Sequence, residues 1–211
     1  MKNRKPYDLK YVMILYDFGQ VVINSYLTYT IYTICVDSWE HRCMVKNNPV
    51  YIRHNAKRIQ AVAWHTCLIK FIDLIDTVLF VLRKKANQVS FLHVFHHALM
   101  CMIITWAVRN IDSFAIGFYL GFAMSINTSV HVVVYFYYGV SALGPQMNKY
   151  LWWKKYLTLF QMCQFTAILS YMLHGFMTGC EEVAVVEVTV FLYIVAIFIM
   201  FIDFYKKYKD E

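Results

Sequence analysis

Long stretches of apolar residues, separated by short polar segments, run through the whole chain. Each is close to the roughly 20 residues that an α-helix needs to cross the hydrocarbon core of a bilayer. The alternation of polar and apolar residues typical of an outer-membrane barrel is missing. Helices satisfy their own backbone hydrogen bonds, which lipid cannot do for them. The pattern predicts an all-α fold, one polytopic transmembrane helical bundle over residues 1–211, with six spans at about 11–34, 60–82, 91–109, 114–138, 156–174 and 184–204.

Composition supports a membrane protein, and the distribution of charge predicts its orientation. The 211 residues are 60% hydrophobic, and the net charge is +7. If residue 1 faces the cytosol, the cytosolic segments carry thirteen of the Lys and Arg residues: 2, 4, 5, 10, 83, 84, 85, 149, 154, 155, 206, 207 and 209. The opposite side carries six: 42, 46, 53, 57, 58 and 109. By the positive-inside rule both ends are cytosolic, so the basic charge indicates topology and not a nucleic-acid partner.

The two ends of the chain predict its compartment. Residues 1–10 are basic and run directly into a long span, which is not the pattern of a cleavable signal peptide. In 206-KKYKDE-211, Lys209 and Lys207 are the third and fifth residues counted from the end, as in a dilysine retrieval signal. The alternative is a basic anchor at the membrane edge. We expect a multi-pass protein of the endoplasmic reticulum membrane with a cytosolic C-terminus.

The cysteines fit that orientation. Cys43 and Cys180 fall in the two larger non-cytosolic loops, where an oxidising lumen would preserve a disulfide. Two free thiols are an equally good interpretation of the sequence. The other cysteines lie in or next to spans and are interpreted as packing residues: Cys35, Cys67, Cys101 and Cys163.

Polar side chains inside the spans fall into four groups. Such residues are costly in lipid and usually face a bundle interior. Spacings of three or four residues put the members of each group on one helix face. The predicted orientation brings all four groups to the cytosolic half, so we expect one polar chamber with an apolar extension. The groups are Lys70, Asp73 and Asp76; His93, His96 and His97; Asn127, His131, Tyr135 and Tyr138; and Thr158, Gln161 and Gln164.

Structural explanations exist for some of these groups but not for all. Lys70 and the two aspartates could form an internal salt bridge, the tyrosines an interfacial belt, and the glutamines interhelical hydrogen bonds. Three histidines on one face of a span have no comparable explanation. We therefore favour a functional site.

A polar chamber with an apolar tunnel fits a long-chain amphiphile. Basic and aromatic residues at its cytosolic rim could bind the phosphates and adenine of coenzyme A, or could simply be topogenic charge. These residues are Arg83, Lys84, Lys85, Lys149, Trp152, Trp153, Lys154 and Lys155. A membrane di-iron desaturase or hydroxylase would need several histidine boxes, whereas the chain has one box and eight histidines in all. An imidazole that attacks a thioester, with another that transfers protons, needs only the residues present, so we expect no metal and no cofactor.

In order and spacing the four groups resemble the sequence boxes of the ELO family of very-long-chain fatty acid elongases, condensing 3-ketoacyl-CoA synthases of the endoplasmic reticulum. The family pattern K-x-x-E-x-x-D-T is similar to Lys70, Asp73, Asp76 and Thr77, and H-x-x-H-H to His93, His96 and His97. Two further patterns, N-x-x-x-H-x-x-M-Y-x-Y-Y and T-x-x-Q-x-x-Q, are similar to Asn127, His131, Val134, Tyr135, Tyr137 and Tyr138, and to Thr158, Gln161 and Gln164. The resemblance covers nearly the whole chain.

Three features depart from the family pattern. Asp73 stands where the family has Glu, which shortens the reach of the carboxylate, and Val134 stands where it has Met. Family members also have one more span before the R-K-P stretch, which is residues 4–6 here. The six predicted spans are those of the family's catalytic bundle. The alternative to an active enzyme is an inactive six-span fragment that serves as a subunit of an elongation complex.

The resemblance implies a reaction and a role for each residue. A long-chain acyl-CoA would transfer its acyl group to a histidine, and malonyl-CoA would lose CO₂ and attack it, giving a 3-ketoacyl-CoA. His96 is our expected nucleophile and His97 the next candidate, with His93 completing the box. The expected partners are these two substrates, membrane lipid, other enzymes of the elongation cycle and further subunits, identical or different.

The remaining site residues have supporting roles in this interpretation. His131 would position the malonyl thioester or transfer its proton. Asp73 and Asp76 would orient or charge-balance the histidines and Lys70. The expected substrate-binding residues are Lys70, Asn127, Tyr135, Tyr138, Gln161, Gln164, Arg83, Lys84, Lys154 and Lys155.

Overall fold

The computed structural model describes residues 5–43, 49–85, 88–109, 118–180 and 185–210, and the regular structure of this part is helical throughout. Two short 3₁₀ helices, η1 (Trp39–His41) and η4 (Pro145–Tyr150), accompany the long helices. The long helices are α1 (Lys10–Asp37), α2 (Pro49–Ile72), α3 (Ile75–Leu82), α4 (Phe91–Arg109), α5 (Phe118–Ala142), α6 (Lys154–Thr178) and α7 (Val185–Asp210). The predicted all-α bundle is confirmed.

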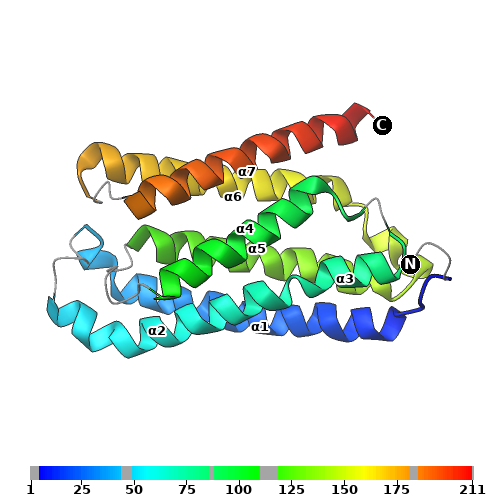
Figure 1. Cartoon of the computed structure of the whole chain (residues 1–211), viewed down its shortest axis with the longest axis horizontal. Coiled ribbons are helices and arrows are strands. Elements are labelled where there is room, and N and C mark those ends of the chain that lie inside the picture. Colours follow the sequence, from blue (N-terminus) through cyan, green and yellow to red (C-terminus); the bar gives the residue numbers. More distant parts are fainter. Residues whose placement is uncertain (1–4, 44–48, 86–87, 110–117, 181–184, 211) are drawn as a thin grey trace.

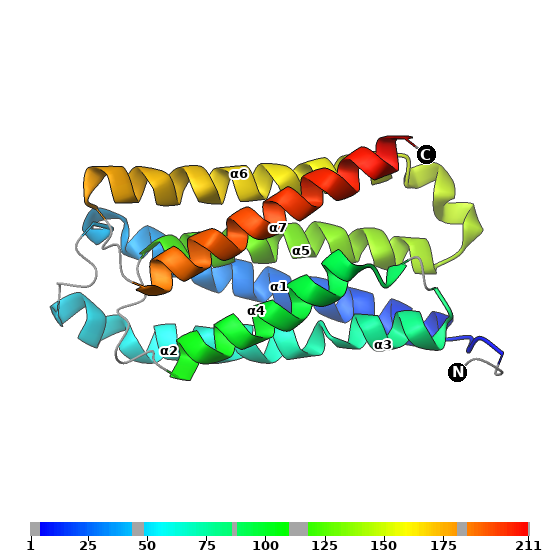
Figure 2. The ribbon, with the colours of Figure 1, turned by 45° about the horizontal axis from the view of Figure 1, so that its top comes forward.

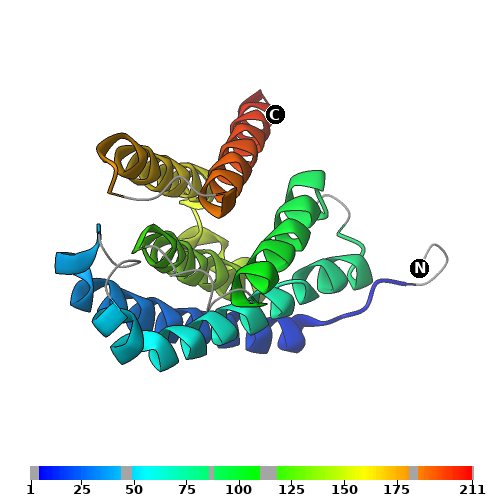
Figure 3. The same cartoon turned by 60° about the vertical axis from the view of Figure 1, so that its left-hand side comes forward.

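The helices lie side by side along one long axis (Figure 1). Helix α5 runs through the centre, with α1 and α2 on one side and α6 and α7 on the other, as the view turned by 60° about the vertical axis also shows (Figure 3). Direct contacts join α1 to α5, α2 to α4, α5 to α6 and α6 to α7. Both ends of the chain lie at the same end of the bundle (Figures 1 and 2). We call this the terminal end.

Four of the described helices are long and apolar enough to cross a membrane, which shows a multi-pass membrane protein. The four stretches are Phe91–Arg109, Leu120–Ala142, Tyr156–Thr178 and Glu187–Lys206, matching the last four predicted spans. The first two predicted spans are helices of the same bundle, but polar residues such as Asp17 and Lys70 lower their hydropathy. The predicted span at 60–82 is also interrupted, because a turn at Asp73 and Leu74 separates α2 from α3.

Helix α1 turns one regular stripe of buried residues into the bundle. The stripe follows steps of four and three residues: Met13, Asp17, Gln20, Asn24, Leu27 and Ile31. Such steps keep one face of a helix turned toward its partner, as in a coiled coil. After Met13, the polar members Asp17, Gln20 and Asn24 form the part of the stripe nearer the terminal end, and Leu27 and Ile31 form the other part. The sequence of α1 thus divides the bundle into a polar and an apolar half.

Close approach of α1 and α5 depends on glycine at both ends of α5. A Cβ atom on Gly139 would lie 3.2 Å from the Phe18 ring, and one on Gly121 would lie 3.2 Å from the Cys35 sulfur. Far from the terminal end, a disulfide joins Cys43, after η1, to Cys180, after α6. The largest apolar cluster lies between α5, α6 and α7 and includes Phe165, Met172, Ile194 and Ile197.

Candidate active site

The turn between α2 and α3 holds a buried ion pair. The Lys70 ammonium lies 3.1 Å from Asp73 Oδ2, and the side chains of Lys70 and Asp73 are 4% and 0% exposed. The Asp73 backbone N–H still donates to the Ile69 carbonyl at 2.8 Å, and the Asp76 N–H donates to the Asp73 carbonyl at 3.2 Å. The turn thus places both carboxylates inside the bundle. A pair so deep in the protein needs further hydrogen bonds to offset the loss of hydration.

Those hydrogen bonds come from α1 and α5. Gln20 Nε2 donates to Asp73 Oδ1 at 2.8 Å. The Tyr135 hydroxyl lies 3.1 Å from Asp73 Oδ1 and 2.7 Å from Asp76 Oδ2. Tyr135 is among the predicted site residues, whereas Gln20 is not. The polar members of the α1 stripe were the available signal, since three polar residues at helical spacing inside a span indicate an interior face.

The three histidines of α4 have different surroundings. The rings of His93 and His97 have centroids 4.5 Å apart, and those of His96 and His97 are 5.3 Å apart. His93 Nε2 is hydrogen-bonded to the Thr77 hydroxyl at 3.2 Å. The box is therefore a compact group of imidazoles beside α3.

His96 has a partner on α7 that sequence reasoning missed. Its Nδ1 lies 2.8 Å from the Tyr193 hydroxyl, and the two rings are parallel within 4°. The only sequence signal was one tyrosine in the apolar run of α7, and a single tyrosine there is not distinctive. Since the hydrogen bond fixes the ring, it decides which imidazole nitrogen remains available.

Helix α5 contributes two buried polar atoms without a protein partner. Asn127 Oδ1 and His131 Nδ1 are both buried and have no hydrogen-bond partner within the protein. The carboxylate of Asp73 lies within electrostatic range of His97 and His131. Unpaired polar atoms in a buried site are suited to receive a substrate or water.

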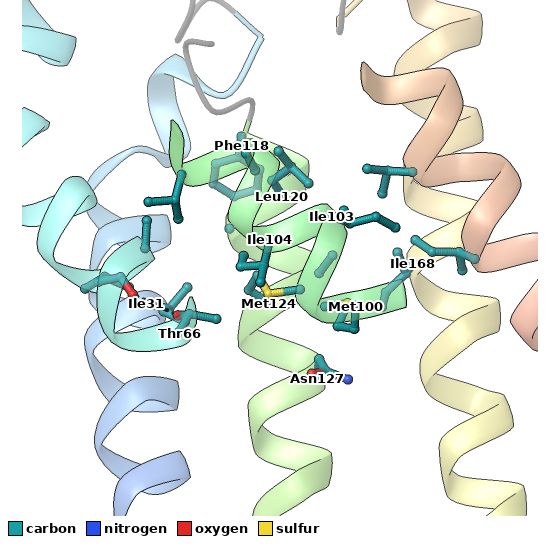
Figure 4. A pocket seen from close by; sticks show the side chains of 18 of the residues that line it. Ile31, Thr66, Met100, Ile103, Ile104, Phe118, Leu120, Met124, Asn127 and Ile168 are labelled. Atoms are coloured by element: carbon teal, nitrogen blue, oxygen red, sulfur yellow. Dashed lines mark hydrogen bonds between the residues drawn. The ribbon is translucent and has the colours of Figure 1, made fainter. Parts of the chain in front are cut away.

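An apolar cavity of about 160 Å³ runs away from His96 through the half of the bundle opposite the terminal end. Figure 4 shows Asn127 at one end and Phe118 at the other, with Met100, Ile104 and Met124 between them. At its polar end the wall includes His96, Asn127, Gln164 and Tyr193. Further residues come from the far ends of α1 and α4: Ile34, Cys35, Ser38, Trp106, Ala107 and Val108. His96 is the one histidine in this wall.

The remaining predicted residues lie outside this cavity wall. Gln161 is half-buried, Tyr138 is 38% exposed, and Lys84 and Lys154 are exposed. Arg83 lines a separate polar cavity at the terminal end, together with Asp8, Lys10 and Asn148. The side chain of Lys155 lies outside the described part of the chain. The described part contains no group of three or more His, Cys, Asp and Glu side chains placed to hold a metal ion.

The fold and the site together define a multi-pass helical membrane protein in which a histidine box meets a buried ion pair at the polar end of an apolar cavity. Comparison with known proteins gives its family. The model of the ELO family, described as the GNS1/SUR4 family, matches residues 1–211. The chain belongs to this family, as the sequence boxes predicted.

Known proteins similar to this chain are named as very long chain fatty acid elongases. The chain is 38% identical over 209 residues to very long chain fatty acid elongase 1 of Mus musculus, covering 97% of this chain and 72% of that protein. It is 40% identical over 200 residues to very long chain fatty acid elongase 7 of Rattus norvegicus, covering 92% and 66%. With very long chain fatty acid elongase 7 of Drosophila melanogaster the identity is 36% over 210 residues, covering 98% and 62%.

Proposed function

We propose that this protein is a condensing enzyme of fatty acid elongation, a very-long-chain 3-oxoacyl-CoA synthase. It joins a long-chain acyl-CoA to malonyl-CoA, releases CO₂ and forms a 3-ketoacyl-CoA. Family membership and the names of the relatives support elongation of fatty acids. The apolar cavity supports a substrate with a long hydrocarbon chain, because burial of each methylene contributes about 0.8 kcal/mol.

One observation carries the proposal: His96 stands where the apolar cavity meets the polar residues of the bundle. An acyl chain that fills the cavity brings its thioester carbonyl to this imidazole. Neither His93 nor His97 lines that wall. We therefore assign the nucleophile to His96 and not to its neighbours.

Tyr193 prepares the imidazole for attack. A neutral imidazole has one N–H and one free lone pair. If Nδ1–H donates to the Tyr193 hydroxyl, Nε2 keeps its lone pair and attacks the thioester carbon. CoA leaves, and the acyl group remains on nitrogen. The Tyr193 hydroxyl also lies 3.5 Å from the His96 backbone carbonyl, and when it donates there its oxygen is left to accept from Nδ1–H.

In the second half-reaction, residues of α2 and α5 act on malonyl-CoA. Loss of CO₂ leaves an enolate, whose developing charge is stabilised by fixed donors. The Lys70 ammonium is such a donor, and His131 is a second when its unpartnered Nδ1 carries the ring proton, while Asn127 lies at the polar end of the cavity wall. Arg83, Lys84 and Lys154 contribute positive charge for CoA phosphates near the terminal end.

The cellular setting follows from the same assignment. We place the protein in the endoplasmic reticulum membrane with its C-terminus in the cytosol, next to the enzymes that reduce and dehydrate the product. The tail lysines and the bias of Lys and Arg support this orientation. The proposed reaction uses only side chains and the two substrates, so we expect it to need no cofactor.

A turnover assay tests the proposed function. Membranes that express the chain receive labelled malonyl-CoA and a panel of long acyl-CoAs. We expect label in products two carbons longer, lost in His96→Ala. The matched control is His174→Ala, since His174 is an exposed histidine of α6 away from the chamber. Label that persists in His96→Ala, in protein expressed at the wild-type level, contradicts the assignment.

A further inference from the structure

The Tyr135 hydroxyl lies between two buried carboxylates. It is 2.7 Å from Asp76 Oδ2 and 3.1 Å from Asp73 Oδ1. The three residues are 2%, 7% and 0% exposed, for Tyr135, Asp76 and Asp73. They are therefore shielded from bulk water, and their hydrogen bonds must be satisfied by other groups of the protein.

Two ionised aspartates and one tyrosine hydroxyl carry one proton too few for both of these hydrogen bonds. A tyrosine hydroxyl carries one proton and donates it to one acceptor, whereas a carboxylate only accepts. Both contacts are hydrogen bonds only if one carboxyl is protonated and donates to the Tyr135 oxygen. Asp73 already accepts from the Lys70 ammonium and from Gln20. Asp73 is therefore the anion, and Asp76 is the acid.

The charges around Asp76 agree with that assignment. Its acidic neighbours are Asp73 and Asp17, and the buried cation Lys70 is paired with Asp73. Asp17, on α1, is 2% exposed and its Oδ2 has no hydrogen-bond partner in the protein. The other titratable or charged groups that face this region are Tyr16 of α1, Arg83 at the end of α3, and His131, Tyr135 and Tyr138 of α5. A second anion in this group would be repelled by the first.

We propose that Asp76 is held as a neutral carboxylic acid and supplies, through the Tyr135 hydroxyl and Asp73, the proton that the condensation consumes. The first half of this inference concerns the resting protein alone, and the second half rests on the proposed function. Asp76 acts through Tyr135, so it is a positioning and relay residue.

The proton balance of the reaction requires such a supply. In acyl transfer the imidazole N–C bond forms, the C–S bond breaks, and the N–H proton leaves with the thiolate as CoASH. This step needs no external proton. In condensation malonyl-CoA loses CO₂, its carbon attacks the acyl carbon, and the C–N bond breaks. The imidazole nitrogen keeps that electron pair and needs one proton.

The hydrogen-bond contacts trace this route from Asp76 as far as Lys70. With Asp76 protonated, its proton passes to the Tyr135 oxygen, and the Tyr135 hydroxyl proton passes to Asp73. The Lys70 ammonium, within electrostatic range of His96, His97 and His131, gives one proton to the imidazole and takes the relayed proton from Asp73. Asp76 recovers its proton from solvent before the next turnover.

Infrared spectroscopy of the purified full chain tests the protonation state directly. A neutral acid shows a carbonyl stretch separate from the carboxylate bands and sensitive to D₂O. We expect this band in the wild-type protein, with a component that is lost in Asp76→Asn and persists in Asp17→Asn, the matched variant of another buried carboxyl. In Tyr135→Phe the band remains but shifts, because the acid loses its acceptor.

Half-reactions test the relay. Asp76→Asn keeps a neutral hydrogen-bonding side chain of the same shape but cannot give up a proton. We expect a normal release of CoA from acyl-CoA alone, and a steady-state turnover with malonyl-CoA about 100-fold or more below wild type. A side chain that only supports the structure would change both steps together.

The outcomes separate this inference from the proposed function. Absence of the acid band from the wild-type protein, or a band unchanged in Asp76→Asn, overturns the neutral acid. Wild-type turnover in Asp76→Asn overturns the relay. If the wild-type chain neither releases CoA nor elongates, the proposed function and the relay fall together, while the infrared band still decides the state of Asp76.

Discussion

At the residue scale, the hydrogen bond between His96 and Tyr193 gives the clearest distinction within the histidine box. The box alone offers three equivalent imidazoles on one helix face. The structure gives only His96 both a place in the cavity wall and a hydroxyl partner on α7. The assignment of the nucleophile thus depends on a residue 97 positions away in the chain.

Tyr193→Phe removes that hydroxyl and leaves the ring. A hydrogen bond contributes about 0.5–1.5 kcal/mol, so we expect a rate of acyl transfer about 3- to 10-fold lower with unchanged folding. Rapid-quench measurement of CoA release checks this. In a His96→Ala background the same substitution should have no further effect, and an additive loss would mean that Tyr193 acts elsewhere.

Gln20→Leu tests the support of the ion pair from α1. The substitution leaves Asp73 without its 2.8 Å donor, and an unsatisfied buried acceptor costs about 1–3 kcal/mol. We expect a lower midpoint of thermal unfolding in detergent and a lower turnover. Ser25→Ala, at an exposed position of the same helix, is the control and should leave both unchanged. Equal behaviour of the two variants would contradict a role of Gln20 at Asp73.

Sequence reasoning found the four sequence boxes but not the side chains that their residues contact. Periodicity shows which residues share a helix face, as it did for Asp73, Asp76 and the histidines. It does not show which helix lies opposite, because that depends on packing between distant segments. Gln20 and Tyr193 were missed for this reason, and Gln161 was expected closer to the chamber than it lies.

At the element scale, the α1–α5 contact sets the geometry of the chamber. Gln20 and Tyr135 reach Asp73 from these two helices, so their separation controls both hydrogen bonds. The contact is close at Gly139, where a Cβ atom would lie 3.2 Å from the Phe18 ring and 3.4 Å from Asp17 Cβ. A small change of helix spacing there therefore acts on the site.

Gly139→Ala should widen this contact. Overpacking of a tight helix contact costs about 1–3 kcal/mol, so we expect reduced thermal stability and reduced turnover. Gly19→Ala is the matched control: a Cβ atom at this α1 glycine meets nothing within 4 Å. That variant should be neutral or more stable by up to about 1 kcal/mol, because alanine favours the helix. Equal stability of the two variants would contradict the close contact.

The helical elements were largely predictable except around the second span, where α2 begins at Pro49 and not near residue 60. The predicted span at 91–109 coincides with α4, and the last spans differ from α6 and α7 only by a few residues at their ends. Hydropathy predicts such boundaries because lipid penalises polar residues. The turn at Asp73 and Leu74 was not predicted, because neither Pro nor Gly marks it and its stabilising contacts come from other helices.

At the scale of the whole molecule, the disulfide between Cys43 and Cys180 joins segments 137 residues apart. It connects the loop after α1 with the end of α6. The sequence left this bond and two free thiols equally open. The fold brings the two segments together, and this decides for the disulfide over two free thiols.

Cys43→Ser should lower the midpoint of thermal unfolding. Removal of a native disulfide costs about 2–5 kcal/mol in small domains. Cys163→Ser, at an exposed free cysteine, should leave the midpoint unchanged. A reducing agent should then lower the wild-type midpoint and not that of Cys43→Ser. A wild-type protein insensitive to reduction would contradict a stabilising disulfide.

The central claim is that His96 carries the acyl group between two half-reactions. The most direct test is mass spectrometry of the purified full chain after incubation with a long-chain acyl-CoA and no malonyl-CoA. We predict one acyl group on the peptide that contains His96, none in His96→Ala, and its discharge when malonyl-CoA is added. An unmodified peptide in protein that elongates acyl-CoA, or an acyl group on another residue, would contradict the claim.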